Sequence, residues 1–566
     1  MSSVSAYVVP RARQMEGSPE KRVTLAFLSV GLIALLAGFV LGPPQALNYA
    51  GVDIYDWIPL LSSYYQGLTL HGVLMGLVFT SFFISGLLLY FPARELDMKP
   101  NMALAWTAFW MMTAGTVMAG GAMVANTSNV LYTLYPPLMG HWTFYLGLAL
   151  VVVATLVVAF TVWEMRRAWK RSNPARPTPL VTYMSLVTWI MWAIASLGLA
   201  TGVVVLLLPW SMGITESVDP QLFRTLFWFT GHPIVYFWLL PAYVSWYALV
   251  PRLAGGKLVS DPMARLVFVM FLLFSIPVGF HHQYADPGIP VAWKLVHNIL
   301  TMFVAIPSLI TAFTIAASLE NAGRARGGRG VIGWLPVLPW SNPAFTAQFL
   351  AMVTFIFGGA GGIVLATLNL NLIVHNTAFI PGHFHITVGT AVTMTFMGIV
   401  FWLFPHLTGR SLKAPGAALW SVWLWFIGMM VFAIGMHWQG ILGVPRRTHL
   451  ANMSPHLEGF YADAAFPALL TGLGGVVLLV AGVLFFWSVI ATVLSRPDGG
   501  PVPDMEISDT LSGPYDADGR PKRSVMILER LGMWTVITIV LVACAYLPMI
   551  IHQVAHMSGV PGLRLW

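Results

Sequence analysis

Apolar residues fill this chain in long runs, and the short segments between the runs hold most of its charged residues, glycines and prolines. About 20 apolar residues in a helix cross the hydrocarbon core of a bilayer, so each long run predicts one membrane-spanning helix. We therefore expect an all-α fold, a polytopic bundle of about 13 transmembrane helices that forms one membrane domain over residues 1–566. The predicted spans are 23–46, 65–91, 103–125, 141–163, 183–209, 222–250, 263–284, 291–318, 345–368, 378–405, 416–440, 464–494 and 527–552.

Composition narrows the class of protein. The 566 residues are 57% hydrophobic and 9% charged, whereas a soluble globular chain carries roughly 25% charged residues. Soluble, collagen-like, disordered and nucleic-acid-binding proteins are therefore excluded, although the net charge is +8. The one cysteine, Cys544, excludes an internal disulfide, a C-x-x-C-H heme attachment and a cysteine-rich metal centre within this chain.

The basic residues alternate from loop to loop. If the N-terminus is cytoplasmic, 24 of the 29 Lys and Arg residues lie on the cytoplasmic side, which is the usual distribution in membrane proteins. The five on the outer side are Arg224, Lys294, Arg446, Arg447 and Arg564. We therefore expect a cytoplasmic N-terminus and a C-terminus outside.

Fifteen histidines are many for so apolar a chain, because ionisable groups within spans are costly and usually functional. Eight lie near predicted span ends, where interfacial or hydrogen-bonded histidines are ordinary: His141, His297, His406, His437, His449, His456, His552 and His556. Six others, from four spans, share one level beneath the outer surface: His71, His232, His281, His282, His383 and His385. Their common depth favours metal binding over a set of hydrogen-bonded core histidines.

The spacing of these histidines separates their roles. His383 and His385 are two residues apart and point about 200° apart on a helix, so they cannot share one metal. Opposed imidazoles suit two different irons, and His71 is then a second axial ligand for one of them. An iron with two histidines is coordinatively full and suits electron transfer, whereas an iron with one keeps an open face for a small ligand.

The remaining histidines, His232, His281 and His282, form a three-imidazole set suited to copper with a vacant coordination position. A copper opposite the open iron would hold a diatomic substrate between two redox metals. Tyr236 lies one helical turn from His232, where ordinary packing is one interpretation. Beside a metal pair, its phenol is suited to supply a proton and an electron to bound oxygen.

Several motifs together resemble the catalytic subunit I of heme-copper oxygen reductases. They are the run Trp-Phe-Thr-Gly-His-Pro-Ile-Val-Tyr at 228–236, the His281-His282 pair, Pro-Gly-His-Phe-His at 381–385, and His71. The match covers nearly the whole chain. It implies that His71 and His385 bind a low-spin heme, His383 a high-spin heme, and His232, His281 and His282 the copper called CuB. It also implies a covalent link between His232 and Tyr236.

The pattern looks most similar to the B-type branch of this family, the ba-type cytochrome c oxidases. Ile234 stands where many A-type members have a glutamate, so the proton uptake route that depends on that acid is absent. This branch implies a low-spin heme b and a high-spin a-type heme. Many members have an aspartate four residues before His375, where this chain has Asn371, so a proton-loading role of that acid is not carried over.

Hydroxyl groups along two predicted spans indicate a proton path from the cytoplasm. Tyr236, Tyr243 and Tyr247 form one stripe on the sixth span, and Ser308 and Thr311 lie three residues apart on the eighth. They match the uptake path of B-type members. The alternative is a polar seam that joins two helices.

Arg446 and Arg447 lie on the outer side, against the general trend of basic residues. Paired guanidinium groups there are suited to bind heme propionates through charge-assisted hydrogen bonds. Contact with lipid headgroups is the alternative.

The chain lacks the paired cysteines of a dinuclear copper centre, so electrons have to arrive through another polypeptide. The resemblance implies a subunit II with that centre, a cytochrome c donor, room for a small accessory membrane subunit, and surrounding lipid in the plasma membrane of a prokaryote. The implied function is reduction of O2 to water coupled to proton translocation in aerobic respiration.

Three other functions remain as alternatives. A nitric-oxide reductase has a similar scaffold with non-heme iron, but Tyr236 and the lack of a glutamate near the three-histidine set favour copper and oxygen. A quinol oxidase differs chiefly in its partner subunit. A secondary transporter has no reason to hold its histidines at one level.

Overall fold

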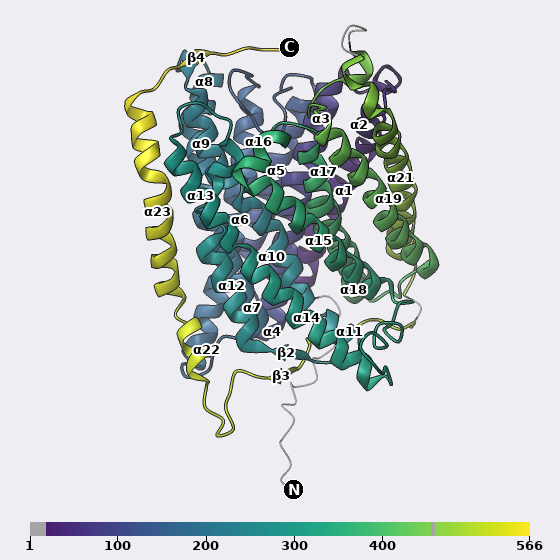
Figure 1. The fold of residues 1–566 in the computed structure, drawn as a ribbon. Helices are drawn as coiled ribbons and strands as arrows, with labels where there is room; N and C mark the ends of the chain where they lie inside the picture. The colour runs from purple at the N-terminus through teal and green to yellow at the C-terminus, as the bar shows by residue number, and fades with distance from the viewer. Residues whose placement is uncertain (1–17, 454–458, 498, 566) are drawn as a thin grey trace.

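Long helices run side by side through the computed structural model, which describes residues 18–453, 459–497 and 499–565 (Figure 1). The expectations for His456 and for the basic N-terminal segment before residue 18 fall outside the described residues. The longer helices are α1 (Pro19–Val40), α4 (Thr80–Glu95), α5 (Met102–Val124), α6 (Trp142–Ser172), α7 (Leu180–Thr201), α10 (Pro233–Ala248), α14 (Ala305–Ala325), α15 (Pro343–Ala366), α18 (Thr393–Thr408), α19 (Pro415–Ile441), α21 (Ala465–Leu494) and α23 (Leu531–Ala555).

Shorter helical segments connect or extend these helices. The α-helical ones are α2 (Gly42–Tyr49), α3 (Tyr64–Val73), α8 (Leu208–Ser211), α9 (Pro220–Gly231), α11 (Val250–Leu253), α12 (Asp261–Phe274), α13 (Val291–Phe303), α16 (Leu368–Val374), α17 (Phe379–Ile386) and α22 (Arg523–Leu528). Within the part of the chain that the structure describes, four are 3-10 helices and three are π-helices. The 3-10 helices are η1 (Tyr55–Trp57), η4 (Gly279–Gln283), η6 (Leu450–Asn452) and η7 (Gly459–Ala464). The π-helices are η2 (Leu74–Phe79), η3 (Gly202–Leu207) and η5 (Thr387–Val392).

Two small pairs of strands lie at opposite ends of the bundle (Figure 1). β1 (Ser217–Val218) pairs antiparallel with β4 (Val560–Pro561). At the other end, β2 (Leu258–Ser260) pairs in parallel with β3 (Thr510–Ser512). These pairs fasten segments that are far apart in sequence to the two rims of the bundle.

Twelve helices within the described residues, several of them built from consecutive segments, are long and apolar enough to cross a membrane. The prediction of an all-α membrane bundle is thereby confirmed. The other predicted span, 263–284, has a different form, because α12 ends at Phe274 and η4 follows after a break. Pro277 lies in that break, and a proline both lacks an N–H and disfavours helix at the preceding residue.

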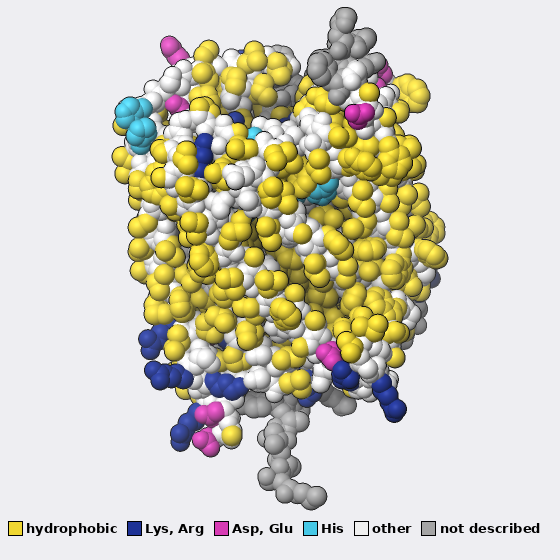
Figure 2. Space-filling view, in the orientation of Figure 1, with side chains coloured by type: hydrophobic (Ala, Val, Ile, Leu, Met, Phe, Trp, Pro, Cys, Tyr) yellow, Lys and Arg dark blue, Asp and Glu magenta, His cyan; other side chains and the backbone are white. Residues whose placement is uncertain are grey.

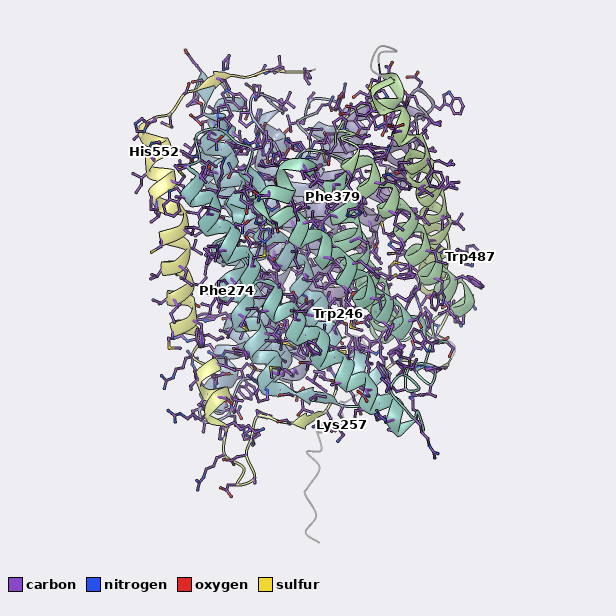
Figure 3. All side chains as sticks on the ribbon, in the orientation of Figure 1. Trp246, Lys257, Phe274, Phe379, Trp487 and His552 are labelled. Carbon is purple, nitrogen blue, oxygen red and sulfur yellow. The ribbon has the colours of Figure 1, made fainter. Side chains whose placement is uncertain are left out.

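The surface of the bundle has an apolar belt and one basic rim. Figure 2 shows Lys and Arg side chains gathered at the end that holds β2, β3 and α22, with hydrophobic side chains covering the sides. Trp487 points away from the bundle and is 63% exposed, whereas Trp246 lies within it (Figure 3). This distribution suits a lipid-facing belt, and the basic rim agrees with the predicted cytoplasmic side.

A buried ionic cluster ties the connection between α22 and α23 to the basic rim. Arg265 on α12 donates to Asp261 Oδ1 at 2.7 Å and lies 3.3 Å from Glu529 Oε2. Glu529 also accepts from Arg166 on α6 at 3.1 Å and from the Thr178 backbone N–H at 3.1 Å. Arg265 is 1% exposed and pairs with the buried Asp261, whereas Glu529 also pairs with Arg166 and Lys170. Asp261 is therefore the acid that depends most on Arg265 for charge neutralisation.

We expect Arg265→Met to destabilise the protein by about 3–5 kcal/mol, because removing one partner of a buried pair leaves the carboxylate of Asp261 buried and uncompensated. Thermal unfolding of the detergent-purified protein measures the effect. Arg324→Met is the matched control, since Arg324 pairs with Glu320 at the same i, i+4 spacing but on the exposed surface, where a pair contributes about 0–1 kcal/mol. Equal stability of the two variants would contradict the structural role of this cluster.

Candidate metal centres

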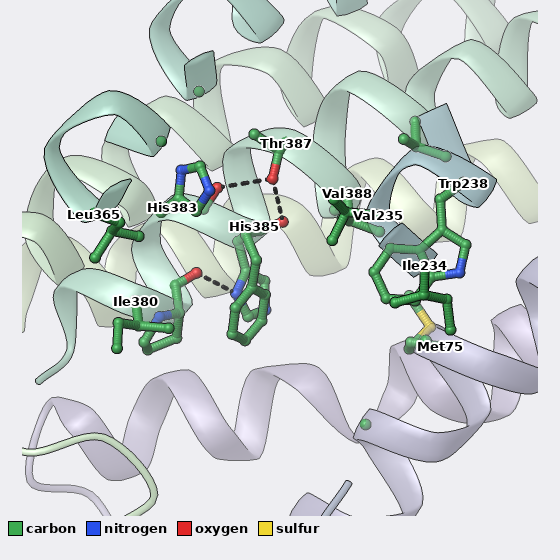
Figure 4. A pocket seen from close by; sticks show the side chains of 18 of the residues that line it. Met75, Ile234, Val235, Trp238, Leu365, Ile380, His383, His385, Thr387 and Val388 are labelled. Carbon is green, nitrogen blue, oxygen red and sulfur yellow. Dashed lines mark hydrogen bonds between the residues drawn. The ribbon is translucent and has the colours of Figure 1, made fainter. Parts of the chain in front are cut away.

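One cavity inside the bundle collects the residues that the sequence singled out. Its volume is about 720 Å³, within the roughly 300–1,000 Å³ of typical ligand sites. Apolar side chains form most of its wall (Figure 4). Its polar lining includes all six histidines of the predicted level and four other predicted residues, Tyr236, Ser308, Arg446 and Arg447.

Three of these histidines converge on one point. The ligand atoms of His232, His281 and His282 all lie within 4.8 Å of one another. His232 Nδ1 is 3.1 Å from His282 Nε2. Trp228 stacks on the His282 ring at 3.9 Å between centroids and thereby fixes that ring. Three converging imidazoles are a suitable set for copper or zinc.

A proline interrupts the helix at His232. This residue separates α9 from α10, and Pro233 provides no N–H for the helical hydrogen bond. The chain keeps its direction, and Tyr236 follows one turn later with its hydroxyl 3.2 Å from His232 Nε2. Since Nε2 faces the phenol and Nδ1 faces His282, Nδ1 is the nitrogen that His232 offers to the shared site.

A threonine sets the protonation of His281. Thr301 Oγ1 donates to the His297 carbonyl at 2.5 Å and lies 3.0 Å from His281 Nδ1. A hydroxyl has one hydrogen, which the carbonyl takes, so Thr301 accepts a hydrogen bond from Nδ1–H of His281. Nε2 of His281 is therefore left as a lone-pair donor, as in histidines whose second nitrogen is held by an acceptor and whose first binds a metal.

His71 and His385 face each other across the cavity. Their ring centroids are 6.2 Å apart and their planes differ by 10°. His71 Nδ1 is 2.7 Å from the Gly38 carbonyl, and His385 Nδ1 is 2.7 Å from the Pro381 carbonyl. A carbonyl only accepts, so each Nδ1 carries the hydrogen and each Nε2 is free to bind a metal. Nearly parallel rings anchored in this way fit axial ligation of one iron from both sides.

His383 leaves α17 in a different direction from His385 (Figure 4). Its ring packs against α15 where that helix has Gly361 and Gly362, and a Cβ at either glycine would lie 3.2 Å from the ring. Nδ1 of His383 is buried and has no hydrogen-bond partner of ordinary geometry. The two glycines thus make room for the His383 ring itself at the cavity wall.

Two π-helices adjoin the facing histidines. His71 lies three residues before η2, and His385 lies two residues before η5. A π turn inserts one residue into a helix and shifts the side chains around it, and such turns are frequent at functional sites. The apolar pattern of the chain gives no signal for these π turns.

The hydroxyl groups of the predicted proton path meet in pairs between α10 and α14. Tyr243 Oη donates to Ser308 Oγ at 3.3 Å, and Tyr247 Oη donates to Thr311 Oγ1 at 3.0 Å. Ser308 and Tyr236 both line the cavity, so the pairs reach it from one side. The same bonds join two helices and therefore also fit the alternative of a polar seam.

Arg446 and Arg447 both line the cavity, but they differ in their hydrogen-bond partners. Arg446 Nη2 donates to Asn376 Oδ1 at 2.8 Å, and Arg447 Nε donates to Tyr132 Oη at 3.3 Å. Burial, with the neighbouring charge of Arg447, lowers the pKa of Arg446 to about 10, so it stays charged at neutral pH. Arg447 Nη2 is buried without a hydrogen-bond partner. A carboxylate is the kind of group that this pair lacks.

His375 and Asn371 form a neutral pair at the cavity wall. Asn371 donates from Nδ2 to the Leu365 carbonyl at 2.6 Å, so its Oδ1 accepts from His375 Nδ1 at 2.9 Å. Burial, with the nearby charge of Arg446, lowers the pKa of His375 to about 4. The imidazole is therefore uncharged at neutral pH.

Sequence reasoning missed several residues that support the site. Thr301, Trp228 and Tyr132 hold predicted residues, but each does so through a contact for which spacing along the chain gives no signal. His297 falls near a predicted span end, yet it is fully buried and hydrogen-bonded to the backbone of two other elements. The exposed His552 lies at the rim of the bundle, as predicted (Figure 3).

Comparison with known proteins gives matches over most of the chain. The family model described as "Cytochrome C and Quinol oxidase polypeptide I" matches residues 22–477. Cytochrome c oxidase subunit 1 of Thermus thermophilus is 52% identical and covers 98% of this chain and 99% of its own. The alternative cytochrome c oxidase subunit 1 of Bradyrhizobium diazoefficiens is 25% identical, with 84% of this chain and 82% of its own covered.

A solved structure matches the fold. A cryo-EM structure of a heme-copper terminal oxidase dimer aligns with a TM-score of 0.91 and 38% identity, covering 97% of this chain and 96% of the other. The resemblance to heme-copper oxygen reductases that the motifs predicted is confirmed, while the B-type branch stays a prediction. Since the family model spans most of the chain and the Thermus relative matches it almost end to end, this chain belongs to the cytochrome c and quinol oxidase polypeptide I family.

Proposed function

We propose that this chain is the catalytic membrane subunit of a cytochrome c oxidase, in which six histidines around one cavity hold two hemes and a copper and O2 is reduced to water. Membership of the family supports the reaction. The observation that carries the assignment of residues is the three-histidine group beside Tyr236, in the same cavity as His383 and the facing pair of His71 and His385.

His71 and His385 hold the low-spin heme, because both present a free Nε2 from a carbonyl-anchored ring. His383 holds the high-spin heme, because it lines the same cavity and its buried Nδ1 has no hydrogen-bond partner of ordinary geometry. His232, His281 and His282 hold CuB. When bound, the hemes and copper supply electrons and the coordination positions at which O2 is reduced. We assign heme b to the low-spin position and an a-type heme to the high-spin position.

The chain's own groups handle protons. Tyr236 holds a proton 3.2 Å from His232 Nε2, at the edge of the cavity. That contact also supports the covalent link between the two side chains. The Tyr243–Ser308 and Tyr247–Thr311 pairs pass protons toward the cavity from the rim with β2 and β3. The apolar wall keeps bulk water from the reacting atoms.

Arg446 and Arg447 bind heme propionates. The unpartnered Nη2 of Arg447 and the charge of Arg446 support this assignment over lipid headgroups, because both arginines line the cavity and neither is exposed. A carboxylate placed there gains charge-assisted hydrogen bonds and neutralises one of the two positive charges, and two carboxylates neutralise both.

The B-type branch is the finer assignment that we favour. Ile234, at the glutamate position of many A-type members, lines the cavity and offers no proton. The chain forms one membrane domain in the plasma membrane of a prokaryote, with its N-terminus in the cytoplasm. Subunit II with a dinuclear copper centre delivers electrons from cytochrome c, and the scheme has room for a small accessory membrane subunit.

Heme extraction and metal analysis of the purified complex test this function. We expect two hemes per chain, one b-type and one a-type, and one copper beyond those of the partner subunit. Oxidation of cytochrome c rather than quinol is expected to drive O2 uptake. A third iron in place of the copper would instead indicate a nitric-oxide reductase, and a complex without heme would refute the proposal.

We expect His385→Ala to abolish the low-spin heme signal and to leave the copper content unchanged, because His385 holds one axial position and is not part of the three-histidine group. Reduced-minus-oxidised visible spectra and the copper-to-iron ratio measure both effects. His552→Ala, at an exposed histidine, is the control and should change neither. Loss of copper with a retained low-spin signal would overturn the ligand assignment.

We expect Tyr247→Phe to slow steady-state O2 uptake by on the order of 10²-fold, since a missing hydroxyl interrupts proton transfer. Heme spectra should stay as in the wild type. Tyr90→Phe removes another buried hydroxyl, one bonded to His406 Nε2 at 2.9 Å, and should keep most activity. If Tyr247→Phe and Tyr90→Phe are equally active, the hydroxyl pairs are a structural seam and not a path.

A further inference from the structure

The segment that carries His281 and His282 has little regular structure to fix it. α12 ends at Phe274, and the 3-10 turn η4 covers only Gly279–Gln283. Within the segment, the backbone of His281 reaches the Val278 carbonyl at 3.3 Å. Two neighbouring imidazoles converge on one point only if this backbone is held in place, so contacts from other elements have to supply the constraint.

A tyrosine on α23 supplies the first constraint. The Tyr546 hydroxyl accepts a hydrogen bond from the Gly279 N–H at 2.8 Å and donates to the Ile276 carbonyl at 3.1 Å. One phenol therefore binds the backbone on both sides of the break after α12. Tyr546 is fully buried and does not line the cavity. The hydroxyl therefore acts on the metal site through its two backbone hydrogen bonds, while the ring packs on Phe280 and His297.

Gly279 allows this close approach. A Cβ at this position would lie 2.3 Å from the Trp228 carbonyl oxygen and 2.4 Å from the Tyr546 hydroxyl. No side chain fits there without moving one of these groups. The absence of a side chain therefore lets the loop, α9 and α23 meet at one point directly before the two histidines.

A histidine on α13 supplies the second constraint. The Phe280 backbone N–H donates to His297 Nδ1 at 3.3 Å, and His297 Nε2 lies 3.2 Å from the Ala545 carbonyl on α23. A backbone N–H only donates and a carbonyl only accepts, so His297 is neutral with its hydrogen on Nε2. It connects the residue before His281 to the residue before Tyr546. Phe280 stacks on the His297 ring at 4.2 Å between centroids.

α23 is otherwise a peripheral helix. It lies at the edge of the bundle (Figure 1), and only 28% of its most apolar 18-residue stretch is buried. It also follows residue 477, where the match to the family model ends. Yet Tyr546 and Ala545, at 0% and 4% exposure, point inward at the loop. A helix needed only as a membrane anchor has no requirement for a buried hydroxyl at this place.

We propose that Tyr546, acting with His297, is a positioning residue that sets the backbone of Gly279–Gln283 so that His281 and His282 meet His232 around copper. The proposal rests on the proposed function of these three histidines as copper ligands. It assigns α23 a role in the metal centre, in addition to its role as a transmembrane segment.

Tyr546→Phe tests this role in the intact oxidase complex, because it removes the hydroxyl and keeps the ring. We expect the affinity for CuB to fall about 10- to 100-fold, as is typical when a group that orients a metal ligand is removed. Titration with a copper chelator, followed by the copper-to-heme ratio of the protein, measures this affinity. The low-spin heme spectrum should be unchanged, which shows that the protein is folded and separates lost positioning from general destabilisation.

Tyr145→Phe is the matched control. Tyr145 is also fully buried, and its hydroxyl accepts a hydrogen bond from the Gly140 N–H at 3.0 Å. This hydrogen bond lies outside the Gly279–Gln283 segment. Its copper affinity should equal that of the wild type. Wild-type copper affinity in Tyr546→Phe, or equal losses in the two variants, would overturn the proposal.

His281→Ala separates this proposal from the proposed function. If His281→Ala loses copper while Tyr546→Phe retains it at full affinity, the copper site stands and the positioning role falls. If His281→Ala retains copper at wild-type affinity, the assignment of ligands itself is wrong and the positioning role falls with it.

Discussion

The site depends on one constraint, that a buried imidazole offers a nitrogen to a metal only when its other nitrogen is held in a defined protonation state. Lipid and apolar side chains leave no bulk water to satisfy such a ring, so the protein itself provides partners for three of the ligand histidines. Gly38 and Pro381 provide carbonyls for His71 and His385, and Thr301 provides a hydroxyl for His281. These partners lie on α1, α17 and α13. The helices that form the bundle therefore also fix the protonation of the proposed metal ligands.

Interruptions of regular helix determine where those imidazoles point. Pro233 follows His232, and Pro277 precedes the turn with His281 and His282. π-helices follow His71 and His385 within three residues. A continuous helix would place its side chains at fixed 100° steps, which cannot bring six rings from four spans to one cavity. Irregular positions therefore lie beside the proposed metal ligands, although the π-helix η3, whose residues do not line the cavity, is irregular as well.

Much of this arrangement is predictable from sequence, because ionisable residues in apolar runs are rare and their spacing restricts which can share a metal. The group of His232, His281 and His282 follows from that reasoning. The contact of Tyr247 with Thr311 is predicted chiefly by resemblance. The apolar pattern predicts span 263–284 as continuous because its apolar residues continue past the break at Pro277. Tyr546 and His297 escape prediction, since a bond between helices about 250 residues apart leaves no periodic signal.

The hydroxyl pairs between α10 and α14 have a consequence for the timing of turnover. Thr311 donates its single hydrogen to the Pro307 carbonyl and Ser308 donates to the Val304 carbonyl, each one turn back on the same helix. In the proposed path, a hydroxyl that passes a proton onward has to swing away from its carbonyl and then return before it accepts the next one. Conduction along these hydroxyl groups therefore alternates proton transfer with reorientation, and each reorientation has to break a hydrogen bond to a carbonyl of α14 or of the residue just before it.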